Sequence, residues 1–395
     1  MRVVVTGLGA VSSLGVGVEP LWQGLLAGKV GTGPLRRVTV PGLPDAVGGE
    51  VVPAGVRGRP LCLGFGLQAA GQAVADAGLP PGRDRTGVYV GAVLGNRSVL
   101  EAPALAFHQG GAAQPDAGPV PGPGELAAEI SRELGAAGPS VVVGTACAAG
   151  NTALSVAVRA IRAGRLDAAV VCGVDELAPS MFMLFGSLRA MSRDVVRPFD
   201  AERTGMLVAE GGAALVVESE ASARARGAHL YGEVLACADT SDAYHITSPH
   251  PQGRGAKAAM RAALTSARLD PADIGHISAH GTGTRANDTI EAQAIREVFG
   301  PVTDALPVTS LKGALGHMHG AASLIEAIGC LLAIRDSVIP ATANLVRIDP
   351  DCRLELVLGE PRQGRVDVAL NNAFGFGGNI SCSVFARIGS GYGRD

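Results

Sequence analysis

The chain has 395 residues, of which 47% are hydrophobic and 17% charged, and its formal net charge is −3. This composition supports a large buried core and lacks the basic field that nucleic-acid binding requires. No apolar run reaches the roughly 18 residues needed to span a membrane, so we expect no membrane segment. Met1-Arg2 leads straight into a predicted strand without a signal-peptide pattern, so we expect a cytoplasmic protein.

Strands and helices alternate along the sequence, which is typical of a mixed α/β fold. In chain order, the expected elements are a strand at 3–6, helices at 20–27 and 63–77, a strand at 86–93, a helix at 124–134, a strand at 140–144, a helix at 148–163 and a strand at 168–174. After a strand-like run at 208–218, the alternation restarts with segments 230–238, 255–267, 274–279, 289–299, 322–335 and 366–371. Segment 110–124, rich in glycine, alanine and proline, is expected to be a loop or mobile flap.

A faint internal duplication accompanies this restart. Residues 147–157 overlay 317–327 at an offset of 317 − 147 = 170 residues, and 210–214 pair with 376–380. We therefore expect two halves, 1–220 and 221–395, related by a pseudo-twofold axis that brings equivalent helix starts together. Cys147 and His317 would then occupy equivalent places.

Cys147 stands where the β-branched run VVV at 141–143 stops and a small-residue helical pattern begins. A helix N-terminus favours thiolate over thiol and can lower a cysteine pKa from about 8.5 into the range of roughly 3.5–7.5. The position therefore indicates a nucleophile. The alternative is a buried cysteine that serves as a small apolar side chain.

Two histidines also stand at element ends. His280 follows the predicted strand at 274–279 and opens the glycine-rich run HGTGT, and His317 precedes a long apolar helix. Side chains at element ends can point into a shared cavity, whereas residues within an element are committed to a packing face. Either histidine taken alone has a structural alternative.

These motifs together resemble the β-ketoacyl-acyl-carrier-protein synthases of the thiolase superfamily. The likeness covers nearly the whole chain, from RVVVTGLG at 2–9 through the segments at 141–150, 280–284 and 312–322 to NAFGFGG at 372–378. The motifs RPFD at 197–200, DAYH at 242–245 and TSP at 247–249 are most similar to the chain-elongating type II branch, as is the presence of two histidines. The resemblance implies a thiolase-like fold of α-β-α-β-α layers.

The resemblance also implies roles for single residues. Cys147 would be the nucleophile, and the backbone N–H groups of Cys147 and Phe376 would form the oxyanion hole. The Nε2 atoms of His280 and His317 would hold the enolate oxygen of decarboxylating malonate. Lys312 with Glu291 resembles a charged pair that positions the histidines, although a lysine is more usually a surface charge.

Further positions have supporting roles in the resembled family. Thr282 and Thr284 would hold the phosphopantetheine arm, Asp288 would support the site, Phe374 and Phe376 would gate the acyl pocket, and Arg193 would dock the carrier protein. For Glu291 and Thr284, the alternatives are a helix-face charge and a turn hydroxyl.

The implied reaction is a decarboxylative condensation of malonyl-acyl carrier protein with an acyl chain bound to Cys147. No cofactor would be bound by the enzyme, because phosphopantetheine of the acyl carrier protein carries the substrates. The chain would work as a homodimer or beside a ketosynthase-like chain-length subunit. The alternatives are that the chain is itself a noncatalytic chain-length subunit, or a thiolase acting on coenzyme A esters. A thiolase carries a second catalytic cysteine near its C-terminus, whereas Cys382 falls on a predicted strand.

Two departures from the family bear on the substrate. A proline- and glycine-rich stretch at 114–124 replaces the usual long segment before the nucleophile, and GGNI at 377–380 stands where threonine and asparagine are common. Both changes favour a specialised polyketide or polyene synthase over a fatty-acid enzyme. We expect an obligate dimer with an interface of roughly 2,000 Å² or more, in which residues 109–124 or their contacts on the partner set product length.

Three further sequence patterns bear on metal binding, dinucleotide binding and disulfide formation. His317 with His319, and His276 with His280, each offer two imidazoles to zinc, but neither pair has an evident third ligand in the sequence, so no metal is expected. Gly7-Leu8-Gly9 lacks the third glycine of a dinucleotide loop and is interpreted as a strand-to-helix turn. The seven cysteines include no Cys-x-x-Cys pair, which indicates reduced thiols.

Overall fold

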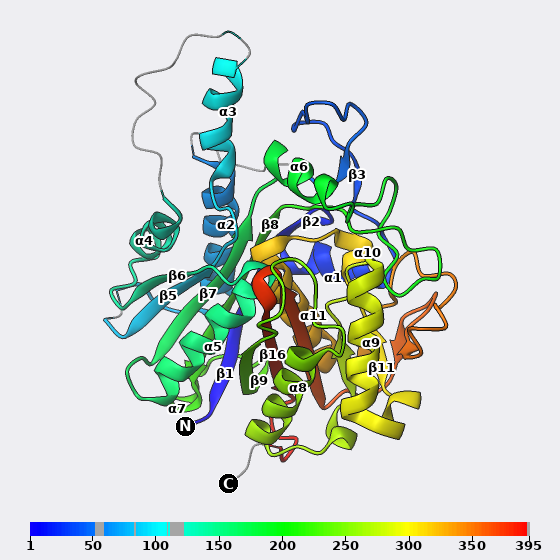
Figure 1. Ribbon diagram of the computed structural model, residues 1–395. Helices are drawn as coiled ribbons and strands as arrows, with labels where there is room; N and C mark the ends of the chain where they lie inside the picture. Colours follow the sequence, from blue (N-terminus) through cyan, green and yellow to red (C-terminus); the bar gives the residue numbers. More distant parts are fainter. Residues whose placement is uncertain (52–58, 83, 109, 111–121, 393–395) are drawn as a thin grey trace.

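A computed structural model describes residues 1–51, 59–82, 84–108, 110 and 122–392 (Figure 1). Most of the stretch at 109–124, to which the sequence assigned control of product length, lies outside the described residues. No helix in the described part of the chain is both long enough and apolar enough to cross a membrane.

The strands are β1 Val3–Ser12, β2 Gly15–Val16, β3 Gly33–Pro34, β4 Val47–Gly48, β5 Thr86–Gly91, β6 Ser140–Val143, β7 Ala168–Asp175, β8 Gly211–Ser219, β9 Gly232–Ser241, β10 His276–Ser278, β11 Pro307–Thr309, β12 Val338–Ile339, β13 Glu355–Leu356, β14 Arg362–Gln363, β15 Val368–Gly375 and β16 Asn379–Ala386. The α-helices are α1 Val18–Leu26, α2 Leu61–Ala77, α3 Arg97–His108, α4 Pro123–Leu134, α5 Ala149–Arg162, α6 Pro179–Ser187, α7 Glu220–Ala225, α8 Arg254–Ala267, α9 Arg285–Phe299, α10 Lys312–Leu315 and α11 Ala322–Asp336. The short 3-10 turns are η1 Ala146–Ala148, η2 Pro271–Asp273, η3 Gly300–Asp304, η4 His319–Ala321 and η5 Phe376–Gly378.

The main sheet has the strand order β13-β11-β10-β15-β16-β9-β1-β8-β7-β5-β6, and β2 pairs with β1 off this path. The order is mirrored about the β1–β9 pair, so that β8 corresponds to β16, β7 to β15, β5 to β10 and β6 to β11. Strand directions follow the same rule, because β7 and β15 each pair antiparallel with β8 or β16 and parallel with β5 or β10. This mirrored order supports the division after residue 220, which we propose as the boundary between the halves.

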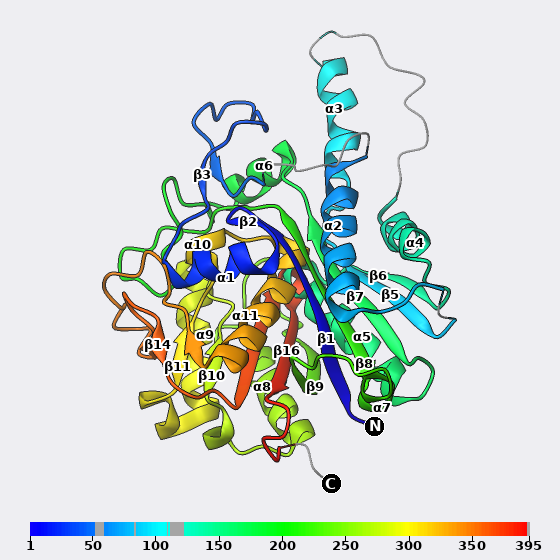
Figure 2. The same ribbon diagram turned by 180° about the vertical axis from the view of Figure 1, so that it is seen from behind.

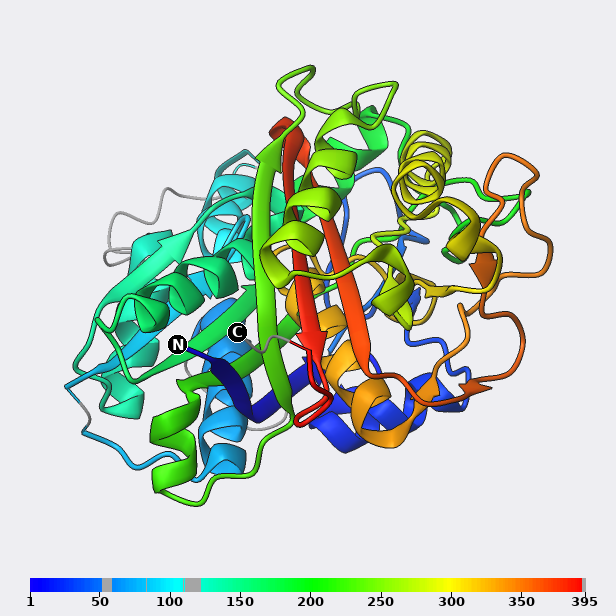
Figure 3. The same cartoon turned by 90° about the horizontal axis from the view of Figure 1, so that it is seen from below.

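The elements stack in layers. Helices α2 and α4 share a hydrophobic cluster with β5, β7 and β8, and α8 and α9 share another with β9, β10, β15 and β16. Between the two halves of the sheet, α5 and α11 pack in a third cluster with residues of β1, β7 and β8. Figure 2 shows α11 from behind, and Figure 3 shows α8 along β9 and β16. This layering confirms the predicted α/β fold class.

Helix α11 lies buried at the centre of the molecule. Every residue from Ala322 to Ile334 is buried, including Glu326. A helix that is apolar all round can be stable only when other elements cover it on every side. The site residues that precede α11 therefore stand on a fixed support.

The duplication is present in the structure, but its register differs from the one predicted. Helices α5 and α11 begin at Ala149 and Ala322, an offset of 322 − 149 = 173 residues. Each follows a three-residue 3-10 turn whose first residue, Ala146 or His319, has a φ of 49°. Cys147 therefore corresponds to Gly320, and the predicted equivalence of Cys147 with His317 is wrong. The sequence match placed similar glycines and leucines in line, whereas the backbone aligns the turns.

The interpretation of Gly7-Leu8-Gly9 as a turn is also wrong. Both glycines lie within β1 and face α2, where a Cβ would come within 2.0 Å of the carbonyl oxygens of Ala73 and Ala69. The glycines thus let a helix lie directly on the strand. The predicted elements also omitted α3, α6 and β11.

Candidate active site

Cys147 lies in η1, between the end of β6 and the start of α5, and is 7% exposed. The turn of Gly375 comes so close that a Cβ there would stand 3.0 Å from the Cys147 nitrogen and 2.9 Å from the Thr145 oxygen. This approach brings the backbone N–H of Phe376, together with that of Cys147, into hydrogen-bonding range of the thiol. The two N–H groups thus converge at the nucleophile, as an oxyanion hole requires.

The acidity of Cys147 differs from the sequence expectation. Burial raises the pKa of this thiol to about 12, although the charge of Lys312 and the N–H groups of Phe376 and Cys147 act to lower it. The free-energy cost of removing the thiolate from water exceeds the stabilisation that these neighbours provide. The expected lowering of the pKa at a helix N-terminus is therefore not found.

His280 and His317 face the same cavity as Cys147, which has a volume of about 400 Å³. Their rings meet edge to face with centroids 5.4 Å apart, and Phe374 lies 5.6 Å from the His280 ring. His280 comes from the turn after β10, and His317 comes from the loop between α10 and η4. Three element ends distant in sequence thus meet in one cavity.

Both histidines are held neutral. Burial, followed by the charge of Lys312, keeps the pKa of His280 well below 6.5. Burial, followed by the nearby His319, Lys312 and His280, does the same for the pKa of His317. Neutral imidazole carries one N–H, so its tautomer decides which nitrogen can donate.

Hydrogen bonds at Nδ1 set the tautomers. The backbone N–H of His319 donates to Nδ1 of His317 at 3.1 Å. The ammonium of Lys312 lies 3.3 Å from Nδ1 of His280 and donates to the His280 carbonyl at 2.6 Å. Because an accepting Nδ1 leaves the proton on Nε2, both rings have an Nε2–H to donate.

Lys312 is 2% exposed, so it is a buried cation rather than a surface charge. Its ion-pair partner is Glu326 of α11, and the predicted pairing with Glu291 is wrong. Glu291 instead accepts the backbone N–H groups of His280 and Gly281, each at 2.8 Å. Sequence reasoning missed Glu326, although a lone acid within the apolar run LIEAI was a usable signal.

Asp288 supports the same glycine-rich turn. Its carboxylate accepts the N–H groups of Thr282 at 3.0 Å, Gly283 at 3.1 Å and Phe199 at 2.8 Å. Gly281 and Gly283 have positive φ values of 37° and 78°, which explains glycine at both positions. The two acids of α9, Asp288 and Glu291, therefore fix the loop that presents His280.

The remaining predicted residues divide into two groups. Thr282 and Thr284 line the cavity with their hydroxyl oxygens 2.9 Å apart, and Phe374 and Phe376 line it too. Arg193 is exposed and is not among the lining residues of the described cavity. The structure thus brings the predicted residues together except for Arg193.

Asp175 and His319 are two further residues that the sequence did not single out for this chemistry. Asp175, at the end of β7, accepts the N–H of Gly320 at 2.7 Å and the N–H groups of residues 93–95 at 2.8–3.0 Å, and so joins the two halves. The His319 ring stacks between His317, at 4.9 Å, and Phe185, at 5.4 Å.

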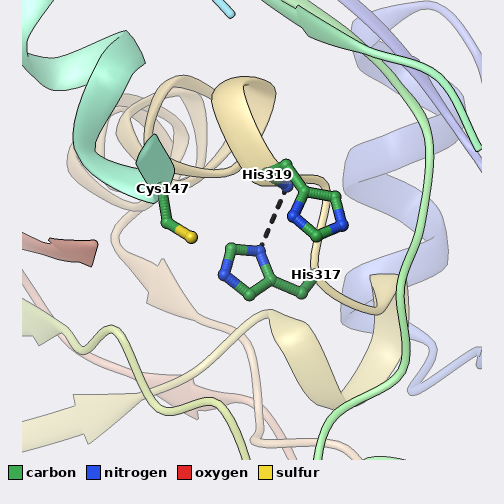
Figure 4. Close-up of side chains that lie close together, drawn as sticks. All are labelled: Cys147, His317 and His319. Carbon is green, nitrogen blue, oxygen red and sulfur yellow. Dashed lines mark hydrogen bonds between the residues drawn. The ribbon is translucent and has the colours of Figure 1, made fainter. Parts of the chain in front are cut away.

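Cys147, His317 and His319 each offer one donor atom, and these atoms lie within 4.8 Å of one another (Figure 4). No third ligand for the histidine pair was evident from the sequence, because Cys147 is remote along the chain. The fold supplies that ligand. Among the described residues, this trio is the group of side chains with donor atoms close enough together to hold a metal ion.

Comparison with known proteins places the chain in a family. Residues 62–223 match the family model for the beta-ketoacyl synthase N-terminal domain, and residues 231–346 match the C-terminal domain. The chain is 38% identical to 3-oxoacyl-[acyl-carrier-protein] synthase 2 of Synechocystis sp. over 98% of both chains. It is 35% identical to nodulation protein E of Rhizobium meliloti over 98% of this chain and 99% of the relative. The chain belongs to the β-ketoacyl synthase family.

Solved structures agree with this assignment. The ishigamide ketosynthase/chain length factor matches with a TM-score of 0.93 and 36% identity over 98% of this chain and 99% of the other. A type II polyketide ketosynthase, solved with its acyl-carrier protein and bound to the hexaketide, matches with a TM-score of 0.91 and 31% identity over the same shares. These neighbours confirm the predicted fold and the predicted likeness to type II synthases of the thiolase superfamily.

Proposed function

We propose that the chain catalyses decarboxylative condensation of malonyl-acyl carrier protein with an acyl chain carried on Cys147, and releases β-ketoacyl-acyl carrier protein. The observation that carries this proposal is the convergence of Cys147, His280 and His317 on one cavity, with both imidazoles neutral. A thiol beside two uncharged N–H donors suits acyl transfer followed by enolate formation.

In the loading step, Sγ of Cys147 attacks the thioester carbonyl carbon of the acyl-carrier protein. A new carbon–sulfur bond forms, the old one breaks, and the phosphopantetheine sulfur leaves with the proton of the Cys147 thiol. Negative charge gathers on the carbonyl oxygen, where the backbone N–H groups of Cys147 and Phe376 meet it. Thr282 and Thr284 line the same cavity and are proposed to hold the amides of the arm.

In the condensing step, malonate loses carbon dioxide, and the electron pair of the broken bond becomes an enolate. The Nε2–H groups of His280 and His317 hold the enolate oxygen. Its carbon then forms a bond to the carbonyl carbon of the Cys147 thioester, and the Cys147 sulfur leaves as a thiolate, which takes a proton from water to restore the thiol. Lys312 is a positioning residue here, because it holds Nδ1 of His280 and is itself held by Glu326.

The two alternatives fit the structure less well. A noncatalytic chain-length subunit has no need of a thiol with two neutral histidines in one cavity. A thiolase needs a second cysteine in the site, whereas Cys382 is fully buried in β16, paired with Ala238 of β9, and is absent from the lining of the described cavity. The reaction needs no bound cofactor, since the carrier protein brings both substrates.

We further propose a type II polyketide or polyene pathway, and a ketosynthase-like partner chain. Structures similar to this chain include a ketosynthase/chain length factor and a ketosynthase in complex with its chain length factor. The acyl carrier protein would dock near Arg193, which is exposed. The cytoplasm suits this pathway and a chain in which all seven cysteines are free thiols.

Intact-mass spectrometry of the protein incubated with acyl-carrier proteins of different chain lengths tests the proposal. We expect one acyl group per chain, mapped to the peptide that contains Cys147, with a preference for some chain lengths. Failure to acquire an acyl group from any of them, or acylation at another residue, would refute the assignment.

A further inference from the structure

His319 is the unusual residue of this site, because its ring stacks on His317 but is absent from the lining of the described cavity. It is 1% exposed, and its Nε2 has no hydrogen-bond partner among the residues that the structure describes. Its backbone N–H supports His317, but any residue other than proline offers that group. The imidazole of His319 therefore has no role in the proposed reaction.

The His319 ring is stacked between two other rings. The ring lies between Phe185 and His317, with an angle of 11° to the His317 ring. In Figure 4, the sulfur of Cys147 points toward His317, and His319 lies beside His317. The three donor atoms lie within 4.8 Å of one another.

One thiolate sulfur and two imidazole nitrogens are the donors that Zn²⁺ favours, and three protein ligands leave a fourth position for water. Zn²⁺ holds sulfur at about 2.3 Å and nitrogen at about 2.0–2.1 Å, so tetrahedral donors stand roughly 3.3–3.6 Å apart. The side chains must therefore close by about 1 Å, which rotation about their side-chain bonds can supply.

Nearby charges both oppose and favour the binding of a metal ion. The Lys312 ammonium opposes a second cation, but it is paired with Glu326. The Asp175 carboxylate lies close enough to Cys147 to raise the pKa of the thiol, and the same negative charge attracts a metal ion. The cavity that admits substrate also gives the ion a path to Cys147 and His317, and the His319 ring stacks directly on His317.

We propose that Cys147, His317 and His319 bind a divalent ion of the Zn²⁺ type, and that this ion reversibly blocks acyl loading. On binding, the Cys147 thiol releases its proton to water and forms a sulfur–metal bond, and one nitrogen of each histidine donates its lone pair to the ion. Binding through either nitrogen of His317 displaces the hydrogen bond that the His319 N–H donates to Nδ1, and binding through Nε2 also moves the ring proton to Nδ1. No electron is transferred, and a chelator restores the thiol. The block rests on the proposed function, because the metal occupies the sulfur that attacks the thioester.

Cobalt is the probe for the site, since a thiolate–Co²⁺ charge-transfer band reports the sulfur ligand without any assay of activity. We expect the wild-type protein to bind one Co²⁺ per chain with this band, and Zn²⁺ to displace it. Cys147→Ala should lose the band. His319→Leu, which keeps bulk and removes the nitrogen donors, should weaken binding by roughly tenfold or more.

His229→Leu is the matched control, because His229 is exposed and contacts Tyr231 away from the cavity. It should bind Co²⁺ as the wild type does. Circular dichroism of each variant verifies folding. A missing thiolate–Co²⁺ band in the wild type, or equal affinity in His319→Leu, would overturn the site.

Acyl loading measured with Zn²⁺, and again after EDTA, tests the block. We expect inhibition that EDTA reverses, and a roughly tenfold higher Zn²⁺ concentration for the same inhibition of His319→Leu, relative to its own metal-free rate. Loading indifferent to Zn²⁺ at saturating occupancy would overturn the block. If the protein shows the Co²⁺ band but never loads an acyl group, the proposed function fails while the metal site stands.

Discussion

The two helix starts at the centre of the molecule share a backbone and differ in what they present. Ala146 and His319 both have a φ of 49°, and α5 and α11 follow at the same distance. The next residue is Cys147 in one half and Gly320 in the other. A Cβ at Gly320 would stand 2.8 Å from Asp175 and from the Ala92 backbone. The turn that contains Cys147 thus faces the cavity, whereas the turn that contains Gly320 is closely packed and has no room for a side chain.

The closed turn still serves the site, through residues before and within it. His317 is held by backbone hydrogen bonds to Leu207 and Ala209 on one side, and by the His319 N–H on its ring. The same supersecondary unit therefore supplies a nucleophile in one half and a fixed hydrogen-bond donor in the other. Substitutions in the two turns can therefore separate their roles.

Cys147→Ala should abolish acyl loading and condensation, because it removes the only nucleophile that we place in the cavity. The fold should persist, since the change deletes one buried sulfur. Intact-mass analysis after incubation with acyl-carrier protein measures the loading. An acylated variant at wild-type stoichiometry would show that the open turn does not carry the nucleophile.

His317→Ala should still accept the acyl group but decarboxylate malonyl-carrier protein roughly 10²–10³-fold more slowly. Loading depends on the thiol and the backbone N–H groups, whereas decarboxylation needs the Nε2–H donors. Acylation by mass spectrometry and carbon dioxide release measure the two steps separately. If loading were lost while decarboxylation survived, the roles of the two turns would be reversed.

Alkylation of Cys147 by iodoacetamide should accelerate about tenfold per pH unit from pH 6 to 9, without a plateau. The pKa of the thiol is raised to about 12, so the thiolate is a small fraction that grows with pH throughout this range. Cys147→Ala supplies the background rate. A plateau with a midpoint below pH 8 would support the helix N-terminus expectation instead of the effect of burial.

Gly320→Ala should lower the free energy of unfolding by about 1–3 kcal/mol, because the added methyl meets backbone and Asp175 atoms that cannot move freely. Urea denaturation provides the measurement. Gly71→Ala in α2 is the control, since a Cβ there meets nothing within 4 Å. A Gly320→Ala variant as stable as this control would mean that the second turn is open as well.

Much of this architecture was accessible from the sequence. The alternation of elements, the duplication and the positions of Cys147, His280 and His317 at element ends follow from local patterns, which periodicity and turn residues reveal. The partners of buried charges cannot be predicted from such local patterns. Lys312 pairs with Glu326 rather than Glu291 because of how α11 packs against α10 and β10, and no local pattern records that contact.

The register of the duplication and the acidity of Cys147 were missed for the same reason. An alignment by residue type places Cys147 opposite His317. The matching backbone conformations of Ala146 and His319 instead place Cys147 opposite Gly320. Position at a helix start predicted an acidic thiol, but burial by the second half of the chain outweighs it. Cys147, the third donor beside His317 and His319, likewise joins that pair only after the halves meet.

The most direct test of the central claim is product analysis with acyl-carrier protein and malonyl-carrier protein labelled with carbon-13 in the free carboxylate. We expect labelled carbon dioxide in equal amount to a β-ketoacyl-carrier protein that is one acetate unit longer and carries no label. A lengthened product that forms from acetyl-coenzyme A without malonate, or an acylated Cys147 that never yields a longer chain, would contradict it.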